Sequence, residues 1–343
     1  MGTDLGSARL RIATYNVEWF NRLFKDDGTL INDGSWSSRW NVTKARQTEA
    51  LGMVFSKMDA DAVMIIEAPD SSPHRDGVVA LETFAKAFGL RANKAMIGFP
   101  NDTQQEIALL YDPQIMQVTH KPLADPERAP RFDQDFLLDV DVDAKPDPIR
   151  WSKPPLEIEV TLPNDKLLHL IGVHAKSKAP HGATEESEAI RISIENRRKQ
   201  LAQCIWLRRR VQAHLSKSNP LIVLGDFNDG PGLDEYEKLF GRSGVEIVLG
   251  EEARNKLFDP HARMVLGSKF GAKPSTARFR RQDGPFLQAL LDYIMVSEDL
   301  MSHQPNWQIW HPFDHPACFE DVTLRDALLD ASDHFPVVLD IAL

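Results

Sequence analysis

A chain of 343 residues that is 42% hydrophobic and 26% charged has the size and composition of a globular protein with a substantial core. It contains no apolar run near the ~20 residues of a membrane span, no apolar signal core within Met1–Arg9 and only two cysteines, Cys204 and Cys318, so we expect a cytoplasmic protein without a disulfide framework. The net charge of −10 argues against tight, non-specific binding of duplex DNA.

The spacing of apolar residues predicts a mixture of strands and helices. In chain order we expect a strand over 10–15, a helix over 43–58, a strand over 62–66, a helix over 78–88, strands over 107–111, 156–162 and 167–173, a helix over 190–215, and strands over 221–225, 291–296 and 337–342. Consecutive strands often lack a helix between them. This favours mixed or antiparallel sheets with helices outside over a doubly wound parallel sheet.

Two segments lack such a pattern. Residues 21–42 contain Gly and several Ser, and residues 121–155 are rich in Pro, Asp and Lys, so we predict that both are long excursions or insertions. The chain shows no internal repeat and no linker that separates two units. We therefore expect residues 1–343 to form one domain.

The most informative segment runs from Leu221 to Asp229. Four apolar residues are typical of a buried strand, Gly225 breaks it, and Asp226 and Asn228 follow at positions i and i+2, which point to the same side of an extended chain. A carboxylate and a carboxamide are thereby offered together at the edge of a sheet, which suits a water molecule and a phosphoryl oxygen. An ordinary Asx-rich turn would have the same sequence, so both interpretations stay open for this segment alone.

Polar side chains end or interrupt other predicted strands as well. They are Asn16, Glu67, His174, Asp292, Asp333 and His334. Most of them, taken singly, are explained as turn or surface residues. Asp292 is different because it lies inside an apolar strand, where a carboxylate is costly unless it is paired or bound to a metal.

The order of these residues resembles that of the endonuclease/exonuclease/phosphatase superfamily, in its deoxyribonuclease I-like branch. The Gly-Asp-Phe-Asn motif at 225–228 and the Ser-Asp-His motif at 332–334 are the most specific parts, and the resemblance runs from about Leu10 to Leu343. It implies an α/β (α+β) fold of four layers, an α/β/β/α sandwich in which two mixed sheets pack face to face with helices outside. It also implies one catalytic domain over 1–343.

The resemblance assigns a metal site. Glu67, Asn16 and Asp333 match positions that help to coordinate a divalent cation in the family. The chain has no Cys-x-x-Cys and no His-rich spacing, so soft-ligand zinc is disfavoured. Oxygen ligands of this kind favour Mg²⁺ or Mn²⁺.

The resemblance also assigns the groups that act on the substrate. Asp226 would orient or deprotonate the attacking water, and Asn228 would donate a hydrogen bond to a phosphoryl oxygen. His174 and His334 would donate to the oxygens that gain charge in the transition state.

Each histidine is expected to have an acidic partner that fixes its tautomer and raises its pKa. The resemblance pairs Glu106 with His174 and Asp292 with His334. The sequence departs from the family at Lys153, where many relatives have Arg, which keeps a positive charge but loses the bidentate geometry.

Together these residues predict a divalent-metal-dependent phosphodiester hydrolase, with an endonuclease or exonuclease acting on nucleic acid as the first choice and a monomer as the expected state. Arg278 and Arg280 would contact the phosphate backbone, and Phe279 between them is available to stack on a base. Arg191, Arg197, Arg198 and Gln200 match a pattern of bacterial nuclease-like relatives, but we interpret these arginines as part of a solvated helix face.

Two alternatives stay open. The same chemistry on a small phosphoester, an inositol phosphate or a phospholipid is slightly favoured by the acidic charge, although no basic amphipathic helix for a lipid surface is evident. A non-catalytic binding protein on the same fold would have lost one or more of the site residues, and none is missing.

Overall fold

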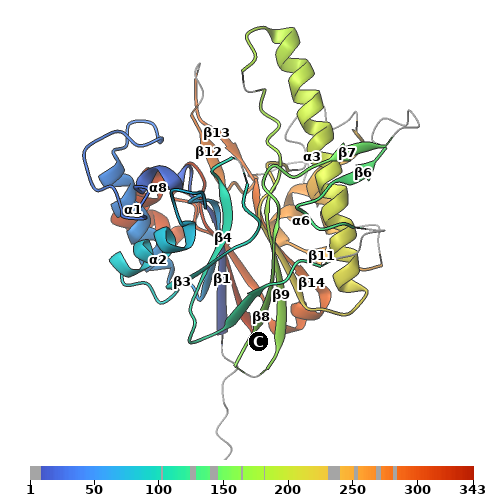
Figure 1. Cartoon of the computed structure of the whole chain (residues 1–343), viewed down its shortest axis with the longest axis horizontal. Coiled ribbons are helices and arrows are strands. Elements are labelled where there is room, and N and C mark those ends of the chain that lie inside the picture. Colours follow the sequence, from blue (N-terminus) through green and yellow to red (C-terminus); the bar gives the residue numbers. More distant parts are fainter. Residues whose placement is uncertain are drawn as a thin grey trace, which may run out of the picture.

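Two six-stranded sheets, counted within the residues described, form the centre of the structure, which is a computed structural model (Figure 1). The structure describes residues 9–101, 103–123, 129–139, 146–163, 165–180, 182–230, 240–250, 254–267, 272–280 and 284–343. The first sheet has the order β15 (Asn306–Ile309), β16 (Val337–Ala342), β1 (Arg9–Asn16), β2 (Ala62–Ala68), β4 (Glu106–Tyr111) and β3 (Lys94–Ile97). The second has the order β11 (Leu257–Phe258), β14 (Asp292–Ser297), β10 (Leu221–Asp226), β9 (Leu167–His174), β8 (Leu156–Thr161) and β5 (Gln117–His120).

Each sheet is mixed, with one parallel pair at its centre. Strands β1 and β2 run parallel in the first sheet, and β9 and β10 run parallel in the second. Their remaining neighbours are antiparallel. The sequence prediction of mixed sheets is therefore confirmed, and the parallel pairs bring four strand ends to one edge of the molecule.

Successive side chains of the central strands point alternately to the inner and the outer face of each sheet, which gives the molecule an inner core between the sheets and outer cores under the helices. Ile12 and Met64 face inward and share a core with Leu224 and Ile294 of the second sheet. Their chain neighbours, such as Ala13 and Ile65, face outward and pack under the helices of the first sheet. Side chains at i and i+2 lie on the same face of a strand, so each buried strand feeds both a central core and an outer one.

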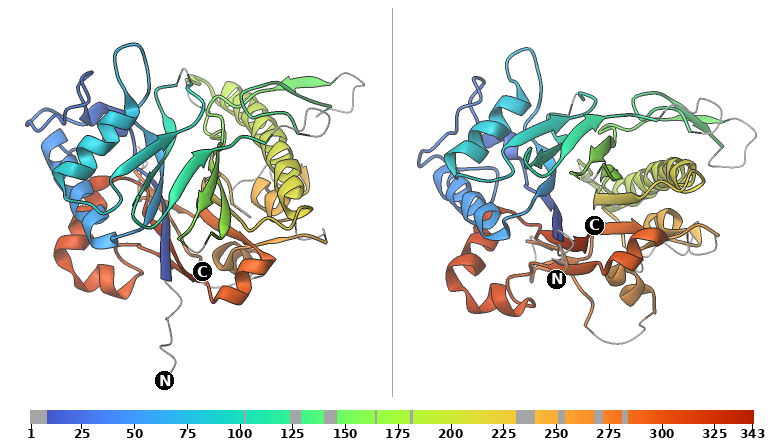
Figure 2. Two further views of the ribbon diagram at one scale, coloured as in Figure 1. Left: turned by 60° about the horizontal axis from the view of Figure 1, so that its bottom comes forward. Right: turned by 90° about the horizontal axis from the view of Figure 1, so that it is seen from below.

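Helices cover both outer faces, as Figures 1 and 2 show. The first sheet is covered by α1 (Lys44–Met58), α2 (Gly77–Ala87), α7 (Pro316–Glu320) and α8 (Val322–Ala331), and the second by α3 (Glu186–Leu215), α5 (Gly244–Leu249) and α6 (Pro260–Gly267). Two 3-10 helices, η1 (Phe20–Leu23) and η2 (Glu298–His303), complete the helices within the described residues. The predicted four-layer sandwich is confirmed. Within the described ranges, no helix is both long enough and apolar enough to cross a membrane.

The long amphipathic and strongly apolar segments were predicted to within a few residues, and the short ones were missed. α3, for example, begins at Glu186 rather than at the predicted residue 190. Helix starts follow their caps, since Thr43 accepts a hydrogen bond from Arg46 at the start of α1. Edge strands such as β3 and β15 have four residues each, too few for a readable period.

The two excursions differ in structure. Residues 21–42 begin in η1 and continue with isolated bridges, among them Trp36 with Thr43. Part of 121–155 lies outside the described residues, and the rest includes the pair β6 (Phe136–Leu138) and β7 (Asp147–Ile149). A further hairpin, β12 (Ala277–Phe279) with β13 (Leu287–Ala289), projects beyond the sheets in Figure 1.

The close approach of the two sheets requires a glycine at position 172. A Cβ there would lie 2.4 Å from Met64 Sδ and 2.9 Å from Ile107 Cγ2 of the opposite sheet. We expect Gly172→Val to lower the free energy of unfolding by ~1–3 kcal/mol through overpacking, measured by urea denaturation. Gly34→Val is the control, because nothing lies within 4 Å of a Cβ at that position. Equal stability of the two variants would contradict this account of the interface.

Candidate active site

Strand ends from both sheets meet at the edge next to the β12–β13 hairpin. In the first sheet Asn16 is in register with Ile66, which places Glu67 beside it. In the second sheet Asp226 is in register with both His174 and Asp292. The Asn16 side chain crosses from one sheet to the other, and its Nδ2 donates to Asp226 Oδ2 over 3.1 Å.

The turn after β10 aims Asp226 at this edge. Gly225 has φ of 137°, and a Cβ at that position would lie 2.0 Å from the carbonyl oxygen of Val173. Only glycine fits both constraints. Asn228 is left-handed with φ of 49°, which folds its backbone N–H onto Asp226 Oδ1 at 2.7 Å. Residues 231 and 232, which follow this turn, lie outside the described part of the chain.

Asp226 is buried and surrounded by donors. Its Oδ2 accepts from Asn16 Nδ2 and from Asn228 Nδ2, each over 3.1 Å. Burial, together with the nearby Asp292 carboxylate, raises the pKa of Asp226 to about 7 despite these hydrogen bonds. This carboxyl can therefore exchange a proton near neutral pH.

The structure changes the role expected of Asn228. Its second side-chain N–H donates to the carbonyl oxygen of Ala175 over 3.1 Å, in addition to the bond with Asp226. Both N–H groups are therefore used inside the protein, and neither is left to donate to a phosphoryl oxygen. The side chain instead holds the Asp226 carboxylate in place.

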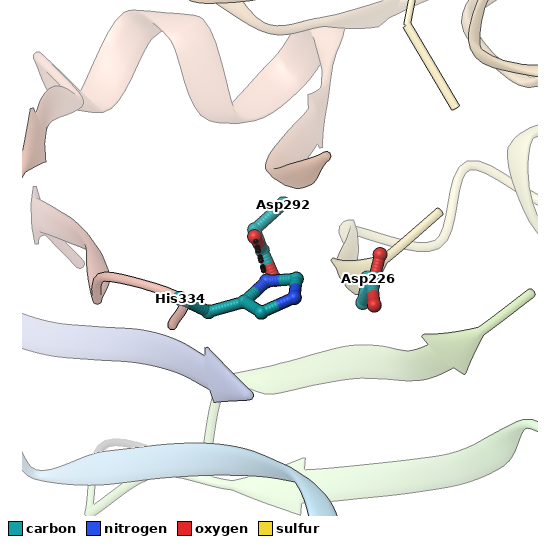
Figure 3. A group of neighbouring side chains, drawn as sticks. All are labelled: Asp226, Asp292 and His334. Carbon is teal, nitrogen blue, oxygen red and sulfur yellow. Dashed lines mark hydrogen bonds and ion pairs between the residues drawn. The ribbon is translucent and has the colours of Figure 1, made fainter. Parts of the chain in front are cut away.

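His334 and Asp292 form the predicted pair (Figure 3). His334 Nδ1 and Asp292 Oδ2 are 2.7 Å apart, and both residues are buried. Burial alone would lower the pKa of His334, but the charge and hydrogen bond of Asp292, with help from Asp226 and Asp333, raise it well above its usual value. His334 thus carries a proton at neutral pH.

His174 does not pair with Glu106, contrary to the expectation. The Glu106 carboxylate accepts instead from Asn101, with Nδ2 to Oε2 at 2.6 Å, and burial raises its pKa to about 7. Nδ1 of His174 is buried without a hydrogen-bond partner among the described residues. Nε2 of His174 lies 3.2 Å from Lys153 Nζ. Burial and the Lys153 charge hold the pKa of His174 well below its usual range, so the ring is neutral.

A second group of carboxylates surrounds the end of β2. A bulge there gives Glu67 a left-handed φ of 61° and turns its Oε2 to the backbone N–H of Trp19, 2.8 Å away. Burial raises the pKa of Glu67 and of Asp333, and for Asp333 the Glu67 charge adds to the effect. Glu18, which was not predicted, has its pKa raised to about 7 by burial and by Asp333.

The site carries more acidic than basic groups. Its carboxylates are Glu18, Glu67, Asp226, Asp292 and Asp333. The cationic groups among them are Lys153, protonated His334 and Arg39. Nη1 of Arg39 lies 2.5 Å from Glu18 Oε2. The carboxyls outnumber the cationic groups, so a divalent cation would compensate the excess negative charge when they ionise. Oδ1 of Asp292 is also buried without a partner within the described residues. The donor set therefore fits a hard divalent metal.

The interpretation of the arginines in the helix after His174 as a solvated face is confirmed for Arg191 and Arg198, which are exposed, and is wrong for Arg197. Arg197 and Gln200 support the site instead. Both are buried. Gln200 Nε2 donates to the carbonyl oxygens of Lys176, Phe227 and Asn228, and so ties the two strand ends together. Arg197 Nη1 donates to Asp229 Oδ1 over 2.9 Å. Glu18 could have been suspected from its i+2 spacing to Asn16, whereas nothing in the local sequence marks α3 as supporting.

The two arginines proposed for substrate lie at the rim. The Arg278 backbone N–H donates to the carbonyl oxygen of Asp333 over 2.7 Å, which attaches hairpin β12–β13 to the edge where the strand ends meet. Phe279 stands edge-on to His334 with ring centroids 5.5 Å apart. Arg280 is exposed and follows at the end of β12.

A protein-family model described as "Endonuclease/Exonuclease/phosphatase family" matches residues 13–334. A comparison with curated proteins finds no match. Among solved structures, truncated TDP2 from Caenorhabditis elegans aligns with a TM-score of 0.52 at 12% identity, covering 99% of this chain and 100% of that one. A mannosyl-6-phosphatase from Bacteroides thetaiotaomicron gives 0.53 at 14% identity, covering 97% and 100%. At such identities these two likenesses concern the fold alone.

We expect ionisation of Asp226 to lower the stability of the metal-free protein as the pH rises. Its pKa is about 7 when folded and ~3.9 when unfolded, so its contribution to stability is full below ~4 and is lost as the pH rises through 7. In EDTA, the melting temperature of wild type minus that of Asp226→Asn should fall by several °C between pH 5 and pH 8.5, since ~1 kcal/mol shifts it by roughly 2 °C in a domain of this size.

The pH-independent loss of hydrogen bonds in Asp226→Asn cancels in that comparison. Thermal unfolding followed by circular dichroism is sufficient to measure it. A difference in melting temperature that stays constant from pH 5 to pH 8.5 would show that Asp226 is ionised throughout.

Proposed function

The chain belongs to the endonuclease/exonuclease/phosphatase family, and from this premise we propose that it is a divalent-metal-dependent phosphodiesterase that acts on nucleic acid. Members of the superfamily are phosphoester hydrolases, which sets the reaction class. The observation that carries the proposal is the placement of Asp226, with its pKa of about 7, between a protonated His334 and a neutral His174.

Asp226 acts as the base for the attacking water. A carboxyl with a pKa near 7 combines a useful ionised fraction with enough basicity to accept a proton. Asn16 and Asn228 restrict its orientation through their amide N–H groups. Positioning of this kind is a large part of phosphoryl-transfer catalysis.

His334 supplies a proton and positive charge on the other side. Asp292 keeps its Nδ1 occupied, so Nε2–H is the group left to donate to an oxygen of the phosphoryl or leaving group. Lys153 takes the charge-neutralising role beside it. Its ammonium donates to Nε2 of neutral His174, and so His174 positions Lys153 rather than donating to the substrate.

Glu67 and Asp333, with Asn16 on the strand next to Glu67, are the residues that would hold the cation. Asp226, Asp292 and His334 also place ligand atoms within 4.8 Å of one another. That trio suits a metal less well, because a protonated imidazole cannot be a ligand. A bound Mg²⁺ or Mn²⁺ supplies Lewis-acid neutralisation of the phosphoryl oxygens.

Arg278 and Arg280 favour an extended anionic substrate over a small one, because they extend the positive charge along a hairpin that leads away from the centre. We propose a monomer that binds nucleic acid there. The alternative is a small phosphoester, since the Bacteroides structure of similar fold is titled a mannosyl-6-phosphatase. A substrate panel separates the two.

We expect hydrolysis of DNA oligonucleotides and of bis(4-nitrophenyl) phosphate with Mg²⁺ or Mn²⁺, and none in EDTA. His334→Gln should lower kcat by ~10²- to 10⁴-fold through loss of the acid. The control is His303→Gln, whose histidine lies in η2 beyond the opposite end of β14, with Nδ1 2.7 Å from the Ala342 carbonyl oxygen. Full activity of His334→Gln would disprove its role. Turnover of 4-nitrophenyl phosphate alone would favour the alternative substrate.

We expect Asp292 to set the pH at which activity falls on the alkaline side, because it raises the pKa of His334. His334 donates only while protonated, so kcat/KM falls as the pH rises through its raised pKa. Asp292→Asn removes the charge that raises this pKa, and the limb should move to lower pH. The measurement is kcat/KM for bis(4-nitrophenyl) phosphate from pH 5 to pH 10. An unmoved limb together with a lower plateau would mean that another group limits the rate.

A further inference from the structure

Two arginine–aromatic stacks lie at the rim of the site, and both arginines belong to the β12–β13 hairpin. Arg280 lies over the ring of Trp40, with Cζ 3.4 Å from the ring centroid. Arg278 lies over Phe286 at 3.3 Å. Trp40 comes from the excursion 21–42, while Phe286 precedes β13 of the hairpin. We call these four side chains the rim platform.

The rim platform is attached to the catalytic centre at Asp333 from both sides. The Arg278 backbone donates to the Asp333 carbonyl oxygen, and Ala277 bridges to His334. On the other side, Arg39, the neighbour of Trp40, binds Glu18 Oε2, which also accepts from the Asp333 backbone N–H over 3.1 Å. Both stacks are therefore held at a defined place next to Asp333 and His334.

The rings of the rim platform do not serve the core. Trp40 is 67% exposed and Phe286 is 44% exposed. Arg278 and Arg280 form no ion pair with any residue that the structure describes. Large exposed rings covered by unpaired guanidinium groups combine flat apolar faces with positive charge, which is the chemistry that binds unpaired bases and the phosphates between them.

Duplex DNA offers the rim platform little. Its bases are stacked on one another, so only phosphates reach the surface, and a chain of net charge −10 gains little from diffuse phosphate contacts. A single strand offers base faces that every aromatic ring accepts. The chemistry at the rim therefore favours unpaired over paired strands.

We infer that the rim platform is a binding subsite for single-stranded nucleic acid, in which bases stack on Trp40 and Phe286 while Arg278 and Arg280 hold the adjoining phosphates. This inference rests on the proposed function and adds to it a preference for unpaired strands. It assigns binding roles to Trp40 and Phe286, which lie 246 positions apart in the chain and are brought to one hairpin, β12–β13, by their stacks with Arg280 and Arg278.

The test measures binding without turnover. Fluorescence anisotropy of a labelled twelve-nucleotide dT strand and of a duplex of equal length is followed in EDTA. We expect wild type to bind the single strand more tightly than the duplex. Trp40→Ala and Phe286→Ala should each weaken single-strand binding by roughly 5- to 150-fold, the range for loss of one base stack. Trp40→Phe keeps a ring and should retain most of the affinity.

Phe319→Ala is the matched control. Phe319 is 50% exposed on α7 and has Arg325 over its ring at 5.5 Å, so it repeats the motif on the outer helical layer. It should bind like wild type. Melting temperatures verify that each variant is folded.

Equal single-strand affinity of wild type, Trp40→Ala and Phe286→Ala would overturn the inference, and so would duplex binding as tight as single-strand binding. Because binding is measured in EDTA, these outcomes are independent of catalysis. The proposed function fails separately, if no phosphodiester is hydrolysed with Mg²⁺ or Mn²⁺.

Discussion

One hydrogen bond between the sheets organises the site, the bond from Asn16 Nδ2 to Asp226 Oδ2. It joins the end of β1 in the first sheet to the end of β10 in the second. Each of these strands has a parallel neighbour, so the bond also sets the positions of Glu67 and His174 relative to one another. A bond of this kind needs sheets that approach closely, and Gly172 removes a side chain that would keep them apart.

Burial of the carboxylates at this edge lowers the stability of the fold, although the proposed chemistry needs these groups. Several carboxylates are desolvated close together, and burial raises the pKa of Asp226, Glu67 and Asp333. A metal-free fold therefore holds negative charge that it would be more stable without. The same charge would attract the divalent cation that we propose for this site. The supporting bonds of Gln200 hold the turn after β10 in place in spite of this repulsion.

Asp333 connects the rim platform to the proposed catalytic residues. Asp333 accepts from the hairpin through its carbonyl oxygen and donates to Glu18 through its N–H, and Glu18 binds Arg39. A change in the charge of this cluster consequently acts on both the cation site and the segments that carry Trp40 and Arg278. We regard the excursion 21–42 as part of the active-site wall for this reason.

The sequence by itself determined the layered fold and the residue types of the site, because strand periods, helix caps and motif order are local properties that a chain displays directly. The apolar strand around Asp292 indicated that this carboxylate needs a partner, the family resemblance paired it with His334, and the structure contains the pair. Only the tertiary structure decided which groups pair. Glu106 binds Asn101, His174 binds Lys153, and both N–H groups of Asn228 are used internally. Buried donors and acceptors take whichever partner lies within about 3 Å in the packed molecule, and that distance depends on how the loops and strand ends pack against one another.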